Sequence, residues 1–222
     1  AGRSRPGPAG AAELIALEAA VACGRCAMPL AHDGDPCPYC TGRGVRPFDH
    51  IVRLGVFDPP LKDLIHRMKY HGDWSLAEEL ADRLWAQDRT QSLLADADAL
   101  VAVPLHPLRQ IVRGYNQAQV IASRLARRAR IRVVAPAVRL RNTDTQTQVT
   151  SQAGRVENLK GAFGIVRRRA IAGRRIVLVA DVMTSGATLR SLARALRPAR
   201  PASLSAIVLA AADPQGPGFE AI

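Results

Sequence analysis

Four cysteines lie within 18 residues of one another and have the spacing of metal ligands. They form two Cys-x-x-Cys pairs, Cys23 with Cys26 and Cys37 with Cys40, and ten residues separate the pairs. One such turn directs two thiolates at a metal, and a second completes the tetrahedral sulfur site of structural Zn(II). Two disulfides are the alternative, which a reducing cytosol disfavours. The spacing therefore predicts a structural zinc ribbon, and His32, between the pairs, is expected to be a solvated loop residue.

A second candidate site lies where an apolar strand turns into a helix. The strand 176–179 is followed by Asp181 and by a turn of small and hydroxyl residues, namely Thr184, Ser185, Gly186, Ala187 and Thr188. Unpaired backbone N–H groups and the helix dipole at such a turn favour an anion. The carboxylate before the turn is placed to bond a ribose hydroxyl or a metal-bound water. The pattern fits a phosphate site, and an ordinary capped strand-to-helix turn fits it equally well.

The segments around these residues alternate between strand and helix. Strands are expected at 50–57, 99–104, 131–138, 176–179 and 204–211, and helices at 61–70, 76–84, 116–130 and 187–197. Asp73 or Ser75 is the expected N-cap of the second helix. Two polar segments, 106–115 and 141–158, are expected to be loops. This order predicts an α/β domain with a mostly parallel sheet, in which ligands bind at the carboxyl ends of the strands.

The chain is expected to divide into three parts. Residues 1–22 form a tail and a short helix, 23–47 form the four-cysteine zinc ribbon, and 48–222 form the α/β domain. The longest apolar run, Ala206–Ala212, is far too short to span a bilayer. The first residues lack the apolar core of a secretory signal. The sequence therefore predicts a cytoplasmic protein without a membrane span.

Positive charge is concentrated in the second half of the chain. Residues 101–222 carry 20 basic and five acidic side chains, a net charge of +15, whereas 1–50 are neutral and 51–100 carry −3. Such a segment favours nucleic acid, a phosphorylated small molecule or an acidic membrane surface. An arginine-rich surface without a partner is the alternative. The aromatic content of 4% disfavours a surface that stacks single-stranded bases.

The strand, the acidic residue and the Thr-Ser-Gly-Ala-Thr turn resemble the signature of type I phosphoribosyltransferases, which binds the 5-phosphate of phosphoribosyl pyrophosphate (PRPP). The wider pattern resembles the ComF family, in which a cysteine ribbon precedes a phosphoribosyltransferase domain and which is associated with DNA uptake in competent bacteria. The resemblance covers about residues 23–212. Its further blocks are Lys69-Tyr-His-Gly-Asp73, Val101–Leu105, Arg113-Gly-Tyr-Asn-Gln-Ala118 and Gly161-Ala-Phe163.

The resemblance implies a role for each block. The segment after Pro104 would be the pyrophosphate loop, in which Arg109 and Arg113 are candidate catalytic residues together with Asp181, and Leu105, His106 and Gly114 are candidate substrate-binding residues. Arginine suits this role because its planar fork pairs with two phosphate oxygens at once; an exposed basic loop is the alternative. The segment 141–158 would be a lid that closes over PRPP, with Thr143 and Arg155 as contacts; simple disorder is the alternative. Mg(II) would bridge the pyrophosphate and the ribose hydroxyls.

One position departs from the family pattern. Phosphoribosyltransferases usually carry two adjacent acidic residues at the end of the signature strand, but here the first position is Ala180 and Asp181 stands alone. The missing carboxylate halves the local negative charge that would organise a metal-bound diol. This departure affects the expected catalysis more than the expected binding.

Two functions follow from the resemblance. The first is a phosphoribosyltransferase-like protein that binds PRPP or a related phosphorylated ribose and transfers ribose 5-phosphate to an acceptor that the sequence does not identify. The second is a non-catalytic accessory protein in DNA uptake, whose basic half binds single-stranded DNA and whose ribbon docks onto a partner such as a competence helicase. The arginine triplet 167–169 is a candidate for DNA contact, and a solvated turn is its alternative. The sequence leaves open whether the protein is an enzyme.

Overall fold

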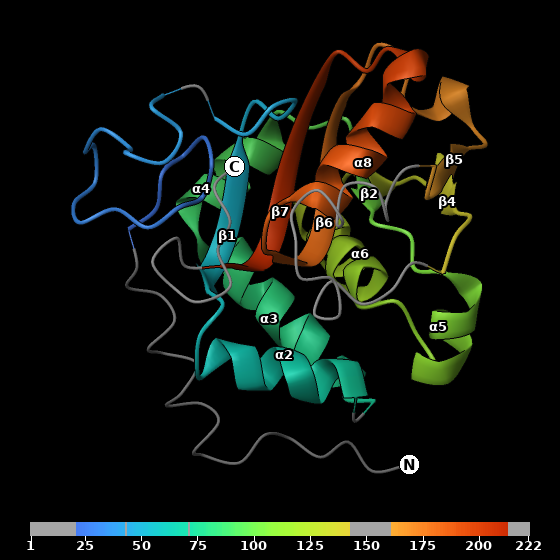
Figure 1. Ribbon diagram of the computed structural model, residues 1–222, viewed down its shortest axis with the longest axis horizontal. Coiled ribbons are helices and arrows are strands. Elements are labelled where there is room, and N and C mark those ends of the chain that lie inside the picture. Colours follow the sequence, from blue (N-terminus) through green and yellow to red (C-terminus); the bar gives the residue numbers. More distant parts are fainter. Residues whose placement is uncertain (1–20, 43, 71, 143–160, 213–222) are drawn as a thin grey trace.

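A parallel sheet forms the centre of the computed structural model, which describes residues 21–42, 44–70, 72–142 and 161–212 (Figure 1). The order of its five strands is β1-β7-β6-β2-β3. Their bounds are β1 Ile51–Val56, β2 Ala99–Ala102, β3 Arg132–Val133, β6 Arg175–Met183 and β7 Ser203–Ala211. All the pairings between these strands are parallel, so their carboxyl ends lie at one edge of the sheet. The predicted fold class is confirmed.

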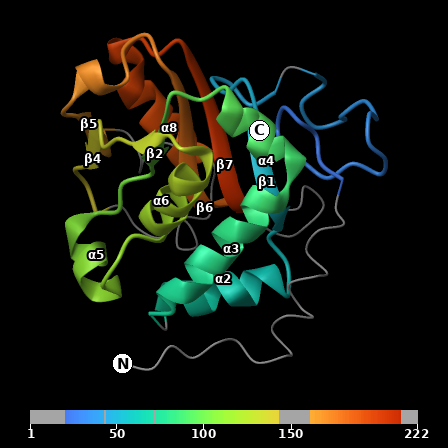
Figure 2. The same cartoon turned by 180° about the vertical axis from the view of Figure 1, so that it is seen from behind.

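Helices cover both faces of the sheet (Figures 1 and 2). One face packs against α2 (Leu61–Tyr70), α3 (Trp74–Ala86), α4 (Asp88–Ala95) and α6 (Gln117–Ala129), and the other packs against α8 (Ala187–Leu196). Side chains of a strand alternate between the two faces. Along β6, Val177 and Val179 accordingly belong to the first core, and Ile176, Leu178 and Ala180 belong to the second.

Local sequence explains the first helices. In α2 the buried residues are Leu61, Leu64, Ile65 and Met68, a spacing that forms one apolar stripe on a helix, and its bounds are those expected. Helix α3 begins where the Asp73 carboxylate accepts a hydrogen bond from the backbone N–H of Leu76 at 3.4 Å. Asp73, rather than Ser75, is therefore the N-cap.

The segment 106–115 is not the loop that was expected. It contains helix α5 (Pro107–Arg113), whose N-cap His106 accepts a hydrogen bond from the backbone N–H of Leu108 at 3.3 Å. Proline at the first helical position favours this start, and Gly114, with a φ of 77°, ends the helix in the left-handed conformation. The loop prediction was wrong: Leu108, Ile111 and Val112 have the i, i+3, i+4 spacing of a helix, although all three side chains are exposed.

The predicted strand 131–138 is two short strands. After β3 the chain passes through Pro136, and β4 (Ala137–Arg139) pairs antiparallel with β5 (Phe163–Ile165) in a separate two-stranded sheet. Proline lacks the N–H that a continuous ladder requires, so a break at this point is expected physically. The 3-10 helices η2 (Arg168–Ala170) and η3 (Arg197–Ala199) lie in the connections that lead to β6 and β7.

Strand β6 is longer than expected. Val182 and Met183 still pair with Ala210 and Ala211 of β7. Asp181 therefore lies within the last three residues of the strand instead of after it, and the main-chain pairing with β7 fixes the direction of its side chain.

The cysteine segment packs on the same core as α8. Cys23, Cys26, Cys37 and Cys40 are buried in one cluster with residues of the sheet and of α8. The predicted tail and most of the predicted helix in 1–22 lie outside the described residues, as do Thr143 and Arg155 of the predicted lid. Within the part of the chain that the structure describes, no helix has the length and apolar character needed to cross a bilayer.

Candidate functional site

A cavity of about 530 Å³ opens at the carboxyl ends of β2 and β6. Its walls come from the segment after β2, the end of β6, the N-terminus of α8, and parts of α2, α5 and α6. The predicted site residues that line it are Leu105, Arg109, Arg113, Asp181, Thr184, Gly186, Ala187 and Thr188. His106, Gly114 and Ser185 do not line it, although each adjoins a residue that does. The fold thus brings the predicted pyrophosphate loop and the predicted phosphate-binding turn together at one edge of the sheet.

The N-terminus of α8 forms one wall of this cavity. Its N-cap, Gly186, has a φ of 69° and provides no side-chain hydrogen bond to the first turn. The Ser185 hydroxyl is fully buried and has no hydrogen-bond partner among the described residues. A buried polar group without a partner is costly, and the first backbone N–H groups of a helix have no partner inside it. The end of this helix is therefore arranged to accept an anion.

Asp181 forms an ion pair across the cavity with Lys69, the second-last residue of α2. The Lys69 Nζ lies 2.9 Å from Oδ2 of Asp181, and the two side chains are 17% and 27% exposed. The other carboxylate oxygen, Oδ1, accepts a hydrogen bond from the backbone N–H of Val182 at 2.8 Å. Burial acts to raise the pKa of Asp181, but Lys69, the Val182 N–H and the charge of Arg113 outweigh it and hold that pKa below its ordinary value.

Arginines from α5 and β4 line another part of the cavity. Arg109 Nε donates to Oδ1 of Asn142 at 3.0 Å, and the Arg113 guanidinium lies 5.6 Å from the centre of the Tyr70 ring. Arg139 lies 5.6 Å from the centre of the Phe163 ring. Burial, together with the charges of Arg109 and Arg113, lowers the pKa of Arg139 to about 10. Cations held this close to one another favour an anionic ligand between them.

Lys69, Arg139 and Gln117 are polar residues of the cavity to which the sequence analysis assigned no role. Lys69 belongs to a block that the family resemblance covers, but only the tertiary structure brings it to Asp181. Arg139 enters the cavity from β4. Gln117 is 2% exposed, and its Nε2 has no hydrogen-bond partner among the described residues. The signal for it was its place in the block Arg113-Gly-Tyr-Asn-Gln-Ala118, which the family resemblance covers.

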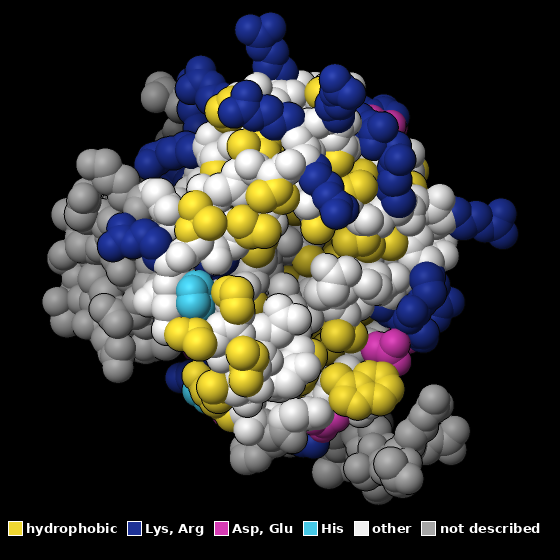
Figure 3. Space-filling model, turned by 90° about the vertical axis from the view of Figure 1, so that its right-hand side faces the viewer, with side chains coloured by type: hydrophobic (Ala, Val, Ile, Leu, Met, Phe, Trp, Pro, Cys, Tyr) yellow, Lys and Arg dark blue, Asp and Glu magenta, His cyan; other side chains and the backbone are white. Residues whose placement is uncertain are grey.

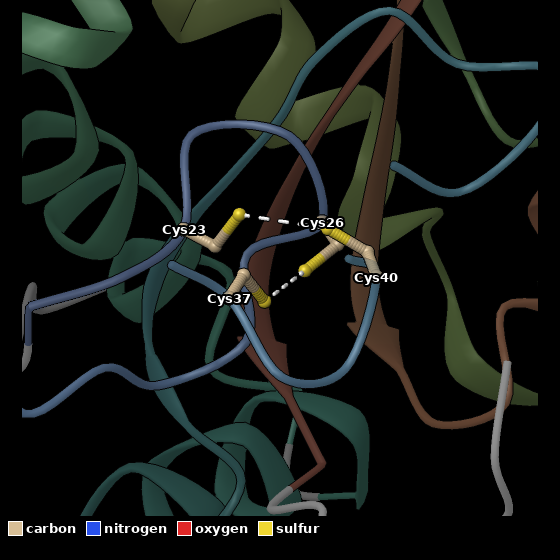
Figure 4. Close-up of side chains that lie close together, drawn as sticks. All are labelled: Cys23, Cys26, Cys37 and Cys40. Atoms are coloured by element: carbon tan, nitrogen blue, oxygen red, sulfur yellow. Dashed lines mark hydrogen bonds between the residues drawn. The ribbon is translucent and has the colours of Figure 1, made fainter. Parts of the chain in front are cut away.

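The four cysteine thiols meet at a single point (Figure 4). All four sulfur atoms lie within 4.8 Å of one another. The Cys23–Cys40 distance is 3.8 Å and the Cys26–Cys37 distance is 3.6 Å. Zn–S bonds of about 2.3 Å in a tetrahedron require sulfur separations of about 3.8 Å. The thiols are therefore free of disulfides and close enough together to hold one metal ion.

The chain is similar in sequence to known proteins and matches one protein-family model. Residues 115–220 match the family model described as "Phosphoribosyl transferase domain". Competence protein F of Haemophilus influenzae is 33% identical over 181 residues, which cover 79% of this chain and 78% of that protein. The DNA utilization protein YhgH of Escherichia coli K12 is 32% identical over 178 residues, which cover 78% of this chain and 77% of that protein.

A solved structure with a similar fold is the glutamine PRPP amidotransferase of B. subtilis complexed with ADP and GMP. It is 20% identical, with 60% of this chain and 26% of that chain covered and a TM-score of 0.38. That relation is too distant to bear on the chemistry of the cavity. The similarity to competence protein F and to YhgH extends over more than three quarters of each chain. The chain therefore belongs to the ComF family, with a phosphoribosyltransferase-like domain.

Proposed function

We propose that the cavity binds PRPP or a related phosphorylated ribose. The 5-phosphate would lie at the N-terminus of α8, against the backbone of Thr184–Thr188, and a ribose hydroxyl would donate to Asp181. The observation that carries the proposal is the uncapped start of α8 beside the buried, unpartnered Ser185 hydroxyl. The first backbone N–H groups of α8 have no partner inside the helix, and Gly186, Ala187 and Thr188 at its start line the cavity.

The arginine wall suits the pyrophosphate. Arg109 and Arg113 lie on α5, and Arg139 lies on β4. In a ligand that lies between α5 and α8, the start of α8 would contact the 5-phosphate and these arginines would contact the pyrophosphate. A guanidinium can donate two parallel hydrogen bonds to a phosphate. The distribution of charge therefore matches a molecule with an anionic group at each end of a neutral sugar.

Mg(II), which the family resemblance implies, fits this cavity poorly. Asp181 is the one carboxylate among the described lining residues, and its charge is already paired with that of Lys69. The amide oxygen of Asn116 accepts from the Ala118 N–H at 3.1 Å. Mg(II) requires oxygen ligands in octahedral geometry. We therefore derive no step of the proposed function through this ion.

Calorimetry with three ligands tests the proposal. PRPP is expected to bind more tightly than ribose 5-phosphate, and ribose 5-phosphate more tightly than ribose, because each phosphate adds charge-assisted hydrogen bonds. Ser185→Ala should weaken ribose 5-phosphate and PRPP alike. Equal affinities for the three ligands, or no heat with any of them, would rule the proposal out.

Transfer of ribose 5-phosphate to an acceptor is the reaction that such binding permits. The C1–pyrophosphate bond would break, the acceptor's nucleophilic atom would bond to C1, and pyrophosphate would leave. Its assay is the release of pyrophosphate from PRPP in the presence of candidate acceptors, with Asp181→Asn as the comparison. Release that is equal in the wild-type protein and the variant would argue against transfer at this site.

We propose that the metal held by the four cysteines is a structural Zn(II). The four thiols are buried, and sulfur fills every position of the tetrahedron, which leaves no position for a catalytic water.

A second candidate function, binding of single-stranded DNA, is favoured by a cluster of exposed arginines. Arg167, Arg168 and Arg169 in and before η2 lie near Arg197 and Arg200 of the η3 turn, since Gly173, just after η2, donates its backbone N–H to the Arg200 carbonyl at 2.9 Å. No ion pair joins these five to an acidic side chain within the described residues. Figure 3 shows Lys and Arg side chains gathered at the upper end of the side that carries α5, β4 and β5.

Fluorescence anisotropy with a labelled oligonucleotide tests this second function. Affinity should fall steeply as salt rises, because each neutralised phosphate releases counterions. Replacing Arg167, Arg168 and Arg169 by Gln should reduce the slope of log affinity against log salt concentration by about two to three. A slope near zero would exclude DNA binding, and a helicase partner of the ribbon would then be the remaining candidate for the accessory function.

A further inference from the structure

The charged side chains that line the cavity are almost all positive. One carboxylate, Asp181, faces five cationic side chains among the described lining residues, namely Lys62, Lys69, Arg109, Arg113 and Arg139. Ala180 stands where the phosphoribosyltransferase signature has a second carboxylate. A site with this balance of charge repels a free divalent cation.

The ammonium of Lys69 occupies the place where a cation would meet Asp181. Its Nζ lies 2.9 Å from Oδ2 of Asp181, within the distance of a charge-assisted hydrogen bond. An ammonium has three donors, and one of them serves this pair. The remaining donors are available to anionic oxygens of a ligand in the same cavity, which Lys69 lines.

Packing holds Lys69 in this position. The preceding residue, Met68, is fully buried, and its carbonyl oxygen accepts a hydrogen bond from the Tyr115 hydroxyl. Leu64 and Ile65 anchor the preceding turn of α2 in the core. The backbone at Lys69 is thus held against the core, and the ion pair with Asp181 places the ammonium before any ligand arrives.

We infer that Lys69 supplies the positive charge that the family resemblance assigns to Mg(II), so that this cavity binds PRPP or a related phosphorylated ribose without a divalent cation. The inference rests on the proposed function and deepens it. A ribose hydroxyl donates to Asp181 while Lys69 donates to a neighbouring anionic oxygen of the same ligand. The single carboxylate is then sufficient, because it has a ribose hydroxyl and an ammonium to bind rather than a metal.

Calorimetric titration with PRPP in two buffers tests the inference on the zinc-loaded full chain. One buffer contains millimolar MgCl₂, and the other is freed of divalent ions on a chelating resin, because a soluble chelator would also extract zinc from the cysteines. The variant is Lys69→Gln. Its matched control is Arg67→Gln, which removes one positive charge from the same helix at a residue that pairs with Asp73 and does not line the cavity. Thermal unfolding checks that both variants fold.

The wild-type protein is expected to bind PRPP with dissociation constants that agree within about threefold in the two buffers. Lys69→Gln should lose on the order of tenfold in affinity without Mg(II), and added Mg(II) should restore part of this loss. Arg67→Gln should bind like the wild type in both buffers.

Binding of PRPP by the wild type only in the presence of Mg(II) would overturn the inference and leave the proposed function intact, and this comparison requires no variant. A Lys69→Gln protein that folds and binds like the wild type without Mg(II) would overturn it equally. No binding of PRPP in either buffer would instead overturn the proposed function, and the inference with it.

Discussion

Two side chains that lie 112 positions apart in the chain determine the character of the cavity. Asp181 and Lys69 neutralise each other at 2.9 Å, so the polar centre of the site carries no net charge before a ligand binds. Around this pair the arginines contribute positive charge, and Gln117 contributes a buried donor without a partner in the described structure. The chemistry of the site thus depends on individual side chains that the fold brings together.

Acid should weaken the Asp181–Lys69 pair. The folded state holds the pKa of Asp181 below its ordinary value, so the pair stabilises the protein above the unfolded pKa of about 4 and loses this contribution as the pH falls through the folded pKa. The difference in free energy of unfolding between the wild type and Asp181→Asn is therefore expected to stay constant from about pH 7 to about pH 5 and to shrink below about pH 4. Denaturant titrations at each pH measure it. A difference in free energy of unfolding that grows in acid would contradict the lowered pKa of Asp181 in the folded state.

Replacing Gln117 by leucine should separate stability from binding. The change removes a buried donor that has no partner in the described residues, so the melting temperature is expected to stay the same or rise. Affinity for PRPP should fall by on the order of tenfold if Nε2 donates to the ligand. The control is Gln119→Leu, on the exposed side of the same helix, which should change neither quantity. A large loss of stability in Gln117→Leu would show a structural role instead.

At the scale of elements, the cavity depends on how α5 and α8 begin and end. Helix α8 starts at a glycine in the left-handed region and leaves its first backbone N–H groups near the cavity, and α5 ends at another such glycine. Helix α5 has no buried residue and is capped by His106 at its start and by Gly114 at its end. It carries Arg109 and Arg113, which line the cavity. Helix α8 buries five residues in the core and is the firmer of the two walls.

Gly186→Ala tests the start of α8. A side chain at a φ of 69° costs about 1 kcal/mol, and a Cβ would lie 3.4 Å from Nη1 of Arg190, so Arg190 must shift slightly. Gly173→Ala is the matched control, because its φ is 66° and a Cβ there meets nothing within 4 Å. Both variants should lose similar stability in thermal melts, but only Gly186→Ala should weaken the binding of PRPP and ribose 5-phosphate. Equal binding by the two variants would place the 5-phosphate elsewhere.

The whole molecule separates its charged features along the strand direction. In a parallel sheet all carboxyl ends face one way, so the cavity forms at one edge, while the η2 and η3 turns with their arginines precede β6 and β7 at the opposite edge. The cysteine segment adds its buried residues to the core on the α8 face of the sheet. The cysteine segment and the α8 wall of the cavity therefore share one core.

Loss of the metal should destabilise the whole protein, because Cys26 and Met28 are fully buried in the core that includes α8. Cys26→Ser is expected to abolish zinc retention and to lower the free energy of unfolding by several kcal/mol, on the order of a structural zinc site. Elemental analysis and thermal unfolding measure the two effects. His32→Ala is the control, since that side chain is 85% exposed and lies outside the group of four thiols. Full zinc content in Cys26→Ser would contradict the four-thiol site.

Features that depend on short-range chemistry could be predicted from the amino-acid sequence. The bounds of α2 follow from its apolar stripe, the start of α3 follows from Asp73, and the meeting of the four thiols follows from two Cys-x-x-Cys turns. The turn from β6 into α8 was also predictable, because Asp181 and the hydroxyl residues near it are close together in the chain. Each of these features depends on residues that lie within the 18 positions spanned by the thiols, or fewer.

Contacts between distant residues became known only from the folded molecule. The pairing of Lys69 with Asp181 requires α2 to end beside β6, and the entry of Arg139 into the cavity requires the chain to leave the main sheet after β3. The extension of β6 to Met183 depends on its pairing with β7, and the exposure of the apolar residues of α5 is seen only in the folded molecule. These features arise from the order of the strands and from packing between elements, and neither can be read from a local pattern of residues in the sequence.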